Sequence, residues 1–260
     1  MIEKSILQLK THLFFKYPFQ WVMPLIQFGS LILFFFFLSN SIDSITTIEG
    51  KYFPFAFMGM ILVHFYQTVS HASASQIRNW QIEGSFIHFL LSPYSLYRIL
   101  FAAGIDQTLK EIIKLFVVII FLKYVYFYES TMDIFFITLS FFLLFTLTFQ
   151  LNLISSLSIL TFKRFNILSV FHTIGMTLFT GSFIPIKVLP IWIQKIAFIL
   201  PLTHIVSLFR FSWTNQNYEF IPKQSIAILV IWNIFIFIFL NFFYRKSEKI
   251  LFLQGKISHL

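Results

Sequence analysis

Residues 134–160 read IFFITLSFFLLFTLTFQLNLISSLSIL and contain no charged side chain. A helix needs about 20 mainly apolar residues to cross the hydrocarbon core of a bilayer. The apolar residues here run continuously, whereas the strands of a membrane barrel alternate apolar and polar positions over about 10 residues. The stretch therefore predicts a membrane-spanning helix.

The composition of the whole chain indicates a membrane protein. Of the 260 residues, 58% are hydrophobic and only 11% are charged, and the mean hydropathy is +0.82. Soluble domains have about 25% charged residues. We therefore predict an all-α integral membrane protein that forms a single domain over residues 1–260. Its six predicted transmembrane helices lie at residues 18–39, 53–74, 99–127, 134–160, 167–184 and 224–244.

Lysine and arginine decide the predicted orientation, because they are enriched on the cytoplasmic side of membrane proteins. Six spans place both termini on one side, and thirteen of the 19 Lys and Arg residues fall on that side. Both termini are therefore expected in the cytoplasm. The net charge of +9 does not indicate nucleic acid, because no segment is both basic and polar enough to form a phosphate-binding face. The expected location is a bacterial cytoplasmic (inner) membrane, with a plastid or other organelle membrane as the alternative.

The sequence contains no recognisable catalytic or metal-binding pattern. Cysteine is absent, and neither the G-x-S-x-G motif of hydrolases nor the H-E-x-x-H motif of zinc enzymes occurs. His64 and His71 share one helix face but lie about 10.5 Å apart along the axis, which is too far to bind one metal ion. We therefore expect no catalytic activity of the chain by itself, no metal and no bound cofactor.

Three segments are expected not to cross the bilayer. Residues 1–17 place apolar and lysine side chains on different faces, which predicts an interfacial amphipathic helix. Residues 75–98 combine polar positions with an apolar stripe and predict either a short helix along the inner membrane face or a loop folded against the bundle. Residues 181–215 are apolar but contain three prolines, which interrupt helices. They predict two short helices, near 188–199 and 202–213, that dip into the outer leaflet.

Two strings within these segments resemble motifs of one family. Residues 83–93 read EGSFIHFLLSP, which is similar to the E-x-G-T-L-E-x-L-L-x-S-P region of the type-2 ABC exporter permeases. Residues 181–204 read GSFIPIKVLPIWIQKIAFILPLTH, which resembles the G-x-x-[FY]-P-x-x-x-L-P-x-W-[LI]-Q-x-[IA]-A-x-x-[LN]-P-L-T signature of the same family. In the first string Ser85 replaces the common Thr, and Ile87 stands where the family usually has Glu. The similarity extends over essentially the whole chain and favours a drug-exporter-like or lipid-exporter-like subgroup.

The resemblance implies a permease subunit of an ATP-driven exporter, whose substrate is amphipathic or lipid-like: a drug, a lipid or a lipid-linked glycan. The chain has no G-x-x-x-x-G-K-[ST] motif, so ATP and Mg²⁺ would bind to a separate ATPase subunit. Two ATPase copies and a second permease, identical or related, would complete the transporter. The residues implied for ATPase coupling, at residues 75–98, are Glu83, Gly84, Ser85, Leu90, Ser92 and Pro93. The residues implied for an outer gate are Gly181, Pro185, Leu189, Pro190, Trp192, Pro201, Leu202 and Thr203.

Charged residues early in the third predicted span allow two interpretations. Asp106 and Lys110 are about one helical turn apart, which suits a local ion pair at the inner interface. Charges within a membrane are also candidates for a substrate path, where these two would attract an anionic head group. The alternative function is an ATP-independent secondary transporter or channel. The few charges in most of the predicted spans, and the absence of evident inverted repeats, disfavour it.

Overall fold

The computed structural model describes residues 26, 29–30, 32–39, 41, 52–125, 133–162, 174–214 and 220–253. The chain divides into two compact units, Met1–Phe57 and Met58–Leu260. The predicted interfacial helix at residues 1–17 lies outside the described residues. The single permease domain stays a prediction.

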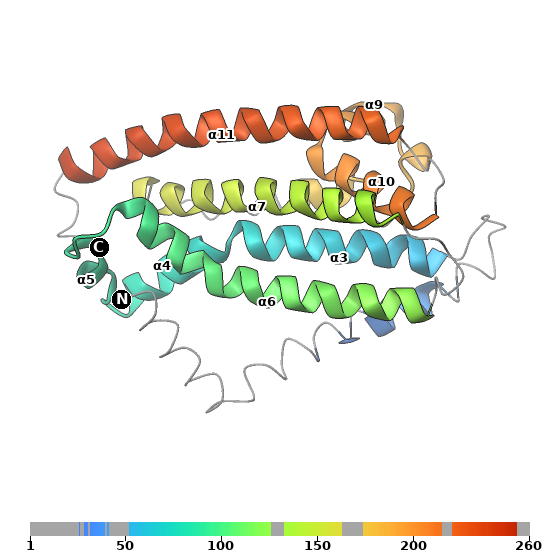
Figure 1. The fold of residues 1–260 in the computed structure, drawn as a ribbon, viewed down its shortest axis with the longest axis horizontal. Coiled ribbons are helices and arrows are strands. Elements are labelled where there is room, and N and C mark those ends of the chain that lie inside the picture. Colours follow the sequence, from blue (N-terminus) through green and yellow to red (C-terminus); the bar gives the residue numbers. More distant parts are fainter. Residues whose placement is uncertain are drawn as a thin grey trace. The chain divides into compact units, whose positions relative to one another are not determined.

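All regular structure in the described ranges is helical, which confirms the predicted all-α class for that part of the chain (Figure 1). The long helices are α3 (Tyr52–Ser70), α6 (Leu96–Val125), α7 (Ile134–Phe162) and α11 (Pro222–Leu253). The shorter elements are α4 (Ala72–Ile82), α5 (Phe86–Leu90), the 3₁₀ turn η1 (Ile186–Val188), α9 (Ile191–Ile199) and α10 (Pro201–Thr214).

Three of these helices are long and apolar enough to cross a membrane: α3, α7 and α11. They overlap the predicted spans at 53–74, 134–160 and 224–244, although α3 ends before residue 74 and α11 extends past residue 244. The pair α9–α10 would add a fourth crossing among the described residues if it were one span.

The other three predicted spans are not among the described helices that meet this criterion. α6 overlaps the predicted span 99–127 up to Val125, but its charged residues, among them Lys110, Glu111 and Lys114, keep it from meeting the same criterion of length and composition. The predicted spans 18–39 and 167–184 are described only in part, at residues 26, 29–30 and 32–39 of the first and at 174–184 of the second. The count of six spans therefore stays a prediction.

α7 is the central helix of the unit Met58–Leu260. It packs against α4, α10 and α11, and α4 packs in turn against α6. Figure 1 shows α4 and α5 near one end of α7, and α9 and α10 near the other end. The two predicted non-spanning segments, 75–98 and 181–215, therefore lie at opposite ends of the long helices of this unit.

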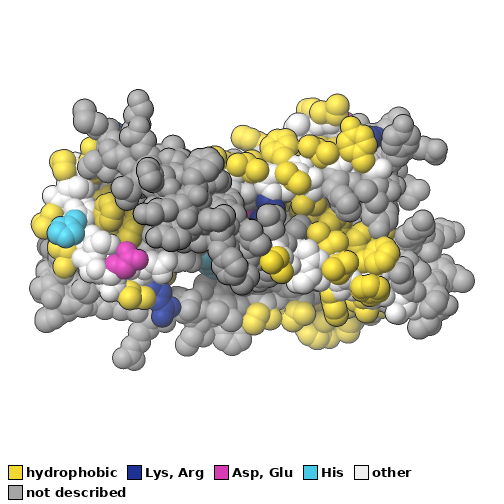
Figure 2. Space-filling view, turned by 90° about the horizontal axis from the view of Figure 1, so that it is seen from below, with side chains coloured by type: hydrophobic (Ala, Val, Ile, Leu, Met, Phe, Trp, Pro, Cys, Tyr) yellow, Lys and Arg dark blue, Asp and Glu magenta, His cyan; other side chains and the backbone are white. Residues whose placement is uncertain are grey.

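Polar side chains lie inside this unit, and much of its described surface is apolar. Thr148, Asn152 and Ser156 of α7 are fully buried, whereas Ile231 and Phe242 of α11 are exposed. Figure 2 shows apolar side chains gathered on one half of the view, and charged and histidine side chains at the α4–α5 end on its left. Helices in a bilayer associate through small and polar side chains, because lipid provides no drive to bury apolar ones. The distribution is therefore typical of a membrane bundle.

Candidate functional site

The first predicted ATPase-coupling residues, Glu83 to Ser85, form the turn between α4 and α5. Gly84 has a φ of 71°, a left-handed conformation that glycine adopts without the strain caused by a β-carbon. A β-carbon at Gly84 would meet no atom within 4 Å. Within the chain, this glycine therefore serves the backbone turn and not close packing.

Aromatic side chains hold α5 against the bundle. Phe86 is only 1% exposed and belongs to a buried apolar core formed with α4, α6, α7 and α11. Trp80 of α4 stacks on Phe89 of α5, with the ring centroids 4.3 Å apart. Ser85 Oγ donates a hydrogen bond to Trp80 O at 3.3 Å. A helix of 5 residues is too short to be stable alone, so these tertiary contacts position it.

The opposite face of the turn is exposed and of mixed character. Ile82 is 77% exposed and Leu91 is 76% exposed. Glu83, Ile87 and His88 are exposed between them. We call these five residues the α4–α5 face. Exposed apolar side chains grouped with polar ones are typical of a protein-binding surface.

The remaining predicted coupling residues, Leu90, Ser92 and Pro93, lie at the end of α5. Ser92 Oγ donates to Phe89 O at 2.5 Å, and α5 ends at Leu90, before the exposed Pro93. The side chain of Leu90 lies outside the described part of the structure.

A buried polar network, which sequence reasoning did not identify, joins the start of α4 to α6 and α7. Ser73 N–H donates to Asn152 Oδ1 at 2.7 Å, and Asn152 Nδ2 donates to Ser73 Oγ at 2.8 Å. Ser73 Oγ donates to Leu100 O at 2.9 Å. The first N–H groups of a helix have no intrahelical acceptor, and Asn152 Oδ1 is the acceptor for the N–H of Ser73. A β-carbon at Gly104 of α6 would overlap Ser73 Oγ and the Asn152 amide, so the network also requires that glycine.

At the other end of the unit, a buried arginine fixes the turn that begins the predicted outer gate. Gly181 has a φ of 68°. Arg210 of α10 is 1% exposed and donates from Nη1 to Gly181 O at 3.1 Å and from Nη2 to Ser182 O at 2.8 Å. A β-carbon at Gly59 of α3 would overlap the carbonyl group of Ser182. The turn is therefore fixed by the hydrogen bonds from α10 and packs closely against α3 at Gly59.

The helices α9 and α10 form a bent pair, with 84° between them. Pro201 begins α10 and has no N–H to continue the hydrogen-bond ladder of α9. The last carbonyl groups of α9 instead meet side chains of other helices: His204 Nε2 lies 2.8 Å from Phe198 O, and Trp232 Nε1 donates to Ile199 O at 2.8 Å. The bend is therefore fixed by both α10 and α11.

The other predicted gate residues lie at the starts of helices or within the α9–α10 pair, where some are exposed and others are buried. Pro185 and Pro190 stand directly before η1 and α9, where a missing N–H breaks no helical hydrogen bond. Leu189 is half-buried, Trp192 is 61% exposed, and Leu202 and Thr203 are fully buried. The structure thus brings the predicted gate residues together at one end of the unit.

A charged cluster links α6 to α3. Glu111 is only 3% exposed, and its Oε1 lies 2.7 Å from Lys114 Nζ. Its Oε2 lies 3.4 Å from His64 Nδ1 of α3. Gln107 Nε2 donates to Glu111 Oε1 at 3.5 Å. We call these four residues the Glu111 cluster.

The charged residues that the sequence predicts as an ion pair or a substrate path are the neighbouring Asp106 and Lys110. Lys110 is half-buried, and the side chain of Asp106 lies outside the described residues, so that ion pair stays a prediction. Glu111 reaches His64 from another helix, a pairing that the spacing of residues along the sequence does not indicate. No group of three His, Cys, Asp or Glu side chains in the described ranges could hold a metal ion.

Comparison with protein families tests the resemblance noted above. Residues 3–213 match the family described as ABC-2 type transporter. The matched range is well over half of the chain and includes both the α4–α5 turn and the α9–α10 pair. The chain belongs to the ABC-2 type transporter family.

This ABC-2 type transporter chain has no match in a comparison with curated proteins. The family assignment confirms the predicted type-2 ABC permease resemblance. Members of the family are membrane components of transporters that are generally not catalytic and that work with an ABC ATPase. The ABC-2 chain is thus an integral membrane permease.

Proposed function

We propose that this ABC-2 permease is part of an ATP-driven exporter that moves an amphipathic or lipid-like substrate out of the cytoplasm or inner leaflet by alternating access. The observation that carries the proposal is the α4–α5 face, which presents Ile82 and Leu91 outward from an anchored turn. Two ATPase subunits, which bind ATP and Mg²⁺, would dock on this face in two permeases. The second permease would be another copy of the chain or a related one.

The contacts behind the α4–α5 face suit the transmission of movement. Phe86 sits in the shared apolar core, and Ser73 is hydrogen-bonded to Asn152 of α7 and to Leu100 of α6. When the ATPases close, α4 and α5 would move together with α6 and α7. Such rigid-body movements are an established type of transporter switch.

The orientation in this proposal follows the distribution of Lys and Arg. The α4–α5 face lies in the cytoplasm, and the α9–α10 pair lies in the outer leaflet as a gate above the substrate path. Trp192 is 61% exposed on α9, which agrees with the enrichment of tryptophan at membrane interfaces. The aromatic content of 21% is compatible with drugs, lipids and lipid-linked glycans alike and does not select among them.

The experiment that tests the docking step is co-purification of the ATPase from the native source with the double variant Ile82→Ala/Leu91→Ala. We expect the recovered ATPase to fall at least about tenfold, because two exposed apolar contacts are worth about 1.4 kcal/mol or more. A matched control is Val188→Ala/Ile134→Ala, which truncates two side chains that are 75% and 71% exposed near the opposite end of the unit. Equal recovery with both double variants would contradict the proposal.

The Glu111 cluster favours one alternative, an ATP-independent secondary transporter or channel. Buried ionisable groups within a membrane are frequent parts of ion and substrate paths. If the purified chain alone carried out transport in liposomes, and Glu111→Gln abolished it, the alternative would replace the exporter. The exporter proposal expects transport only after the ATPase and ATP are added.

A further inference from the structure

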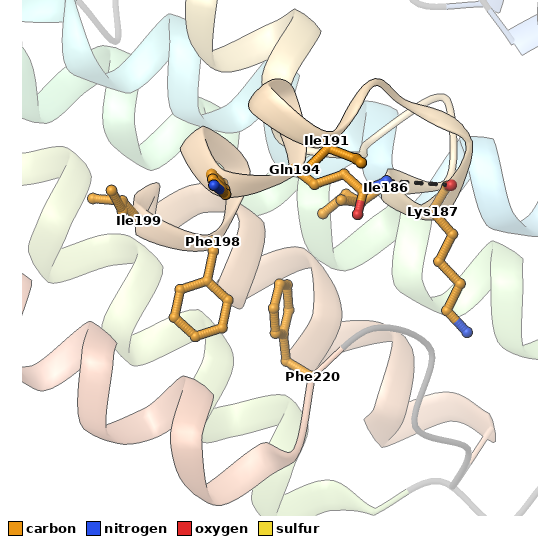
Figure 3. Close-up of a pocket in the computed structure, with 8 residues that line it drawn as sticks. Ile186, Lys187, Ile191, Gln194, Phe198, Ile199 and Phe220 are labelled. Carbon is orange, nitrogen blue, oxygen red and sulfur yellow. Dashed lines mark hydrogen bonds between the residues drawn. The ribbon is translucent and has the colours of Figure 1, made fainter.

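The structure contains a groove beneath α9 that the family assignment does not explain. Its volume is about 450 Å³. Figure 3 shows its lining, which comes from η1, from α9 and from Phe220 just before α11. A site of this volume falls within the range that binds small molecules in proteins. The lining residues are Ile186, Lys187, Ile191, Gln194, Lys195, Phe198, Ile199 and Phe220.

The floor of the groove is apolar. Phe198 and Phe220 meet edge to face, with their ring centroids 5.3 Å apart. Ile191 and Ile199 flank them and are 73% and 61% exposed. Apolar side chains that remain this exposed in a membrane protein contact lipid chains or another apolar ligand.

The rim of the groove is positively charged. Lys187 and Lys195 are both exposed, and neither forms an ion pair within the described residues. No described lining residue is acidic; Glu219, which precedes Phe220 in the sequence, lies outside the described ranges. Gln194 Nε2 donates to Leu189 O at 2.8 Å and to Lys187 O at 3.4 Å, and thereby ties α9 to η1.

We propose that this groove binds an anionic phospholipid of the surrounding membrane. One acyl chain lies over the floor formed by Phe198 and Phe220, and the phosphate lies between Lys187 and Lys195. The charge of the rim decides between candidates: an anionic phospholipid brings a net negative charge to the two lysines, a zwitterionic lipid brings none, and a soluble anion leaves the apolar floor exposed. The lipid is a resident ligand, so the inference goes beyond the proposed transport function.

The test uses a fluorescent probe in the groove. The chain has no cysteine, so Ile199→Cys provides a unique attachment site for a bimane fluorophore. The labelled full-length chain is placed in nanodiscs that contain increasing fractions of phosphatidylglycerol with brominated chains, which quench the fluorophore on contact. Phosphatidylcholine with the same brominated chains provides the comparison lipid.

We expect phosphatidylglycerol to reach half-maximal quenching at a much lower fraction than phosphatidylcholine. Each lysine near an anionic lipid contributes a factor of roughly fivefold, so Lys187→Gln/Lys195→Gln should remove a preference of about 25-fold. Lys223→Gln is the matched control, because this exposed lysine at the start of α11 does not line the groove. It should retain the preference.

Three outcomes would overturn the proposal. Equal quenching by both lipids would show that the groove does not select anionic head groups. If Lys187→Gln/Lys195→Gln still preferred phosphatidylglycerol, the two lysines would not be the cause of the preference. A preference seen only when a partner ATPase hydrolyses ATP would indicate a transported molecule in passage. The lipid titration itself needs neither ATP nor an ATPase, so its failure is distinct from a failure of the proposed export function.

Discussion

At the scale of single residues, small or polar side chains decide how closely the helices of the unit Met58–Leu260 approach one another. Gly104 leaves room for the hydrogen bonds between Ser73 and Asn152, and Gly59 leaves room for the carbonyl group of Ser182. Each of these contacts brings a backbone or a polar group to a place where a larger side chain would not fit. Close approach at small residues is a general feature of helix packing in membranes.

Replacing Asn152 with leucine should destabilise the protein. The change leaves the Ser73 N–H without its acceptor in a fully buried position, which costs about 1–3 kcal/mol. The free energy of unfolding in detergent should fall by that amount. Asn241→Leu is the control, because Asn241 is exposed and its Nδ2 donates only to Phe237 O of its own helix. Comparable losses in the two variants would show that the network adds no stability.

Replacing Gly59 and Gly175 with alanine should have opposite effects. Gly175 lies in the helical residues 174–179. A β-carbon at Gly59 overlaps the Ser182 carbonyl, whereas at Gly175 the nearest atom is Phe179 Cδ2, 4.0 Å away. Alanine is favoured over glycine within helices by about 1 kcal/mol, so Gly175→Ala should leave the melting temperature unchanged or raise it. Gly59→Ala should lower it by several degrees, since overpacking costs about 1–3 kcal/mol. A melting temperature of Gly59→Ala at or above that of Gly175→Ala would refute the predicted overlap.

Sequence reasoning located features that depend on neighbours along the chain and missed those that depend on other helices. The prolines predicted a break between two short helices near 188–199 and 202–213, and Pro190 and Pro201 stand at the starts of α9 and α10, because proline restricts its own backbone. The pairing of Glu111 with His64 joins residues far apart in sequence, and no local pattern indicates it. The same holds for the two carbonyl groups that Arg210 binds.

At the scale of elements, the bend between α9 and α10 depends on hydrogen bonds from outside α9. Its last two carbonyl groups meet His204 of α10 and Trp232 of α11. The predicted spans also show this dependence: α3 ends at Ser70 and not at residue 74, and α4 then begins with its Ser73 N–H bound to Asn152. Apolar runs predict where a helix lies, whereas its end depends on the partners available there.

Removing the indole N–H of Trp232 should loosen the end of α9. Trp232→Phe keeps an aromatic ring but cannot donate to Ile199 O. We expect amide hydrogen exchange in the peptide covering residues 191–204 to become faster, by about fivefold for the loss of about 1 kcal/mol. Trp192→Phe is the matched control, because Trp192 is exposed and donates no hydrogen bond that positions the bend. Unchanged exchange in Trp232→Phe would show that the bend does not need this contact.

At the scale of the whole molecule, α11 connects the two ends of the unit Met58–Leu260. It has 32 residues and is therefore about 48 Å long, which exceeds the roughly 30 Å of a hydrocarbon core. Lys223 lies at its start, near the α9–α10 pair, and Arg245 lies towards its end, and both are exposed. These two positions are about 33 Å apart along the axis, and we expect them to lie on opposite sides of the membrane.

Single cysteines at these positions should therefore label from opposite sides. In intact cells, Lys223→Cys should react with a membrane-impermeant maleimide, whereas Arg245→Cys should react only after the membrane is permeabilised. The absence of native cysteine makes each label unique. The reverse pattern would place the α4–α5 face outside the cell and exclude it as an ATPase-docking surface.

The Ser73–Asn152 network has a mechanical consequence. It clamps α6 near one end, at Leu100, and α6 has 30 residues, which makes it about 45 Å long. From Leu100 to the end of α6 at Val125 the helix is about 38 Å long, so a tilt of about 5° at Leu100 would move that end by about 3 Å. In the proposed exporter, a movement at the α4–α5 face would therefore be larger at the opposite end of α6.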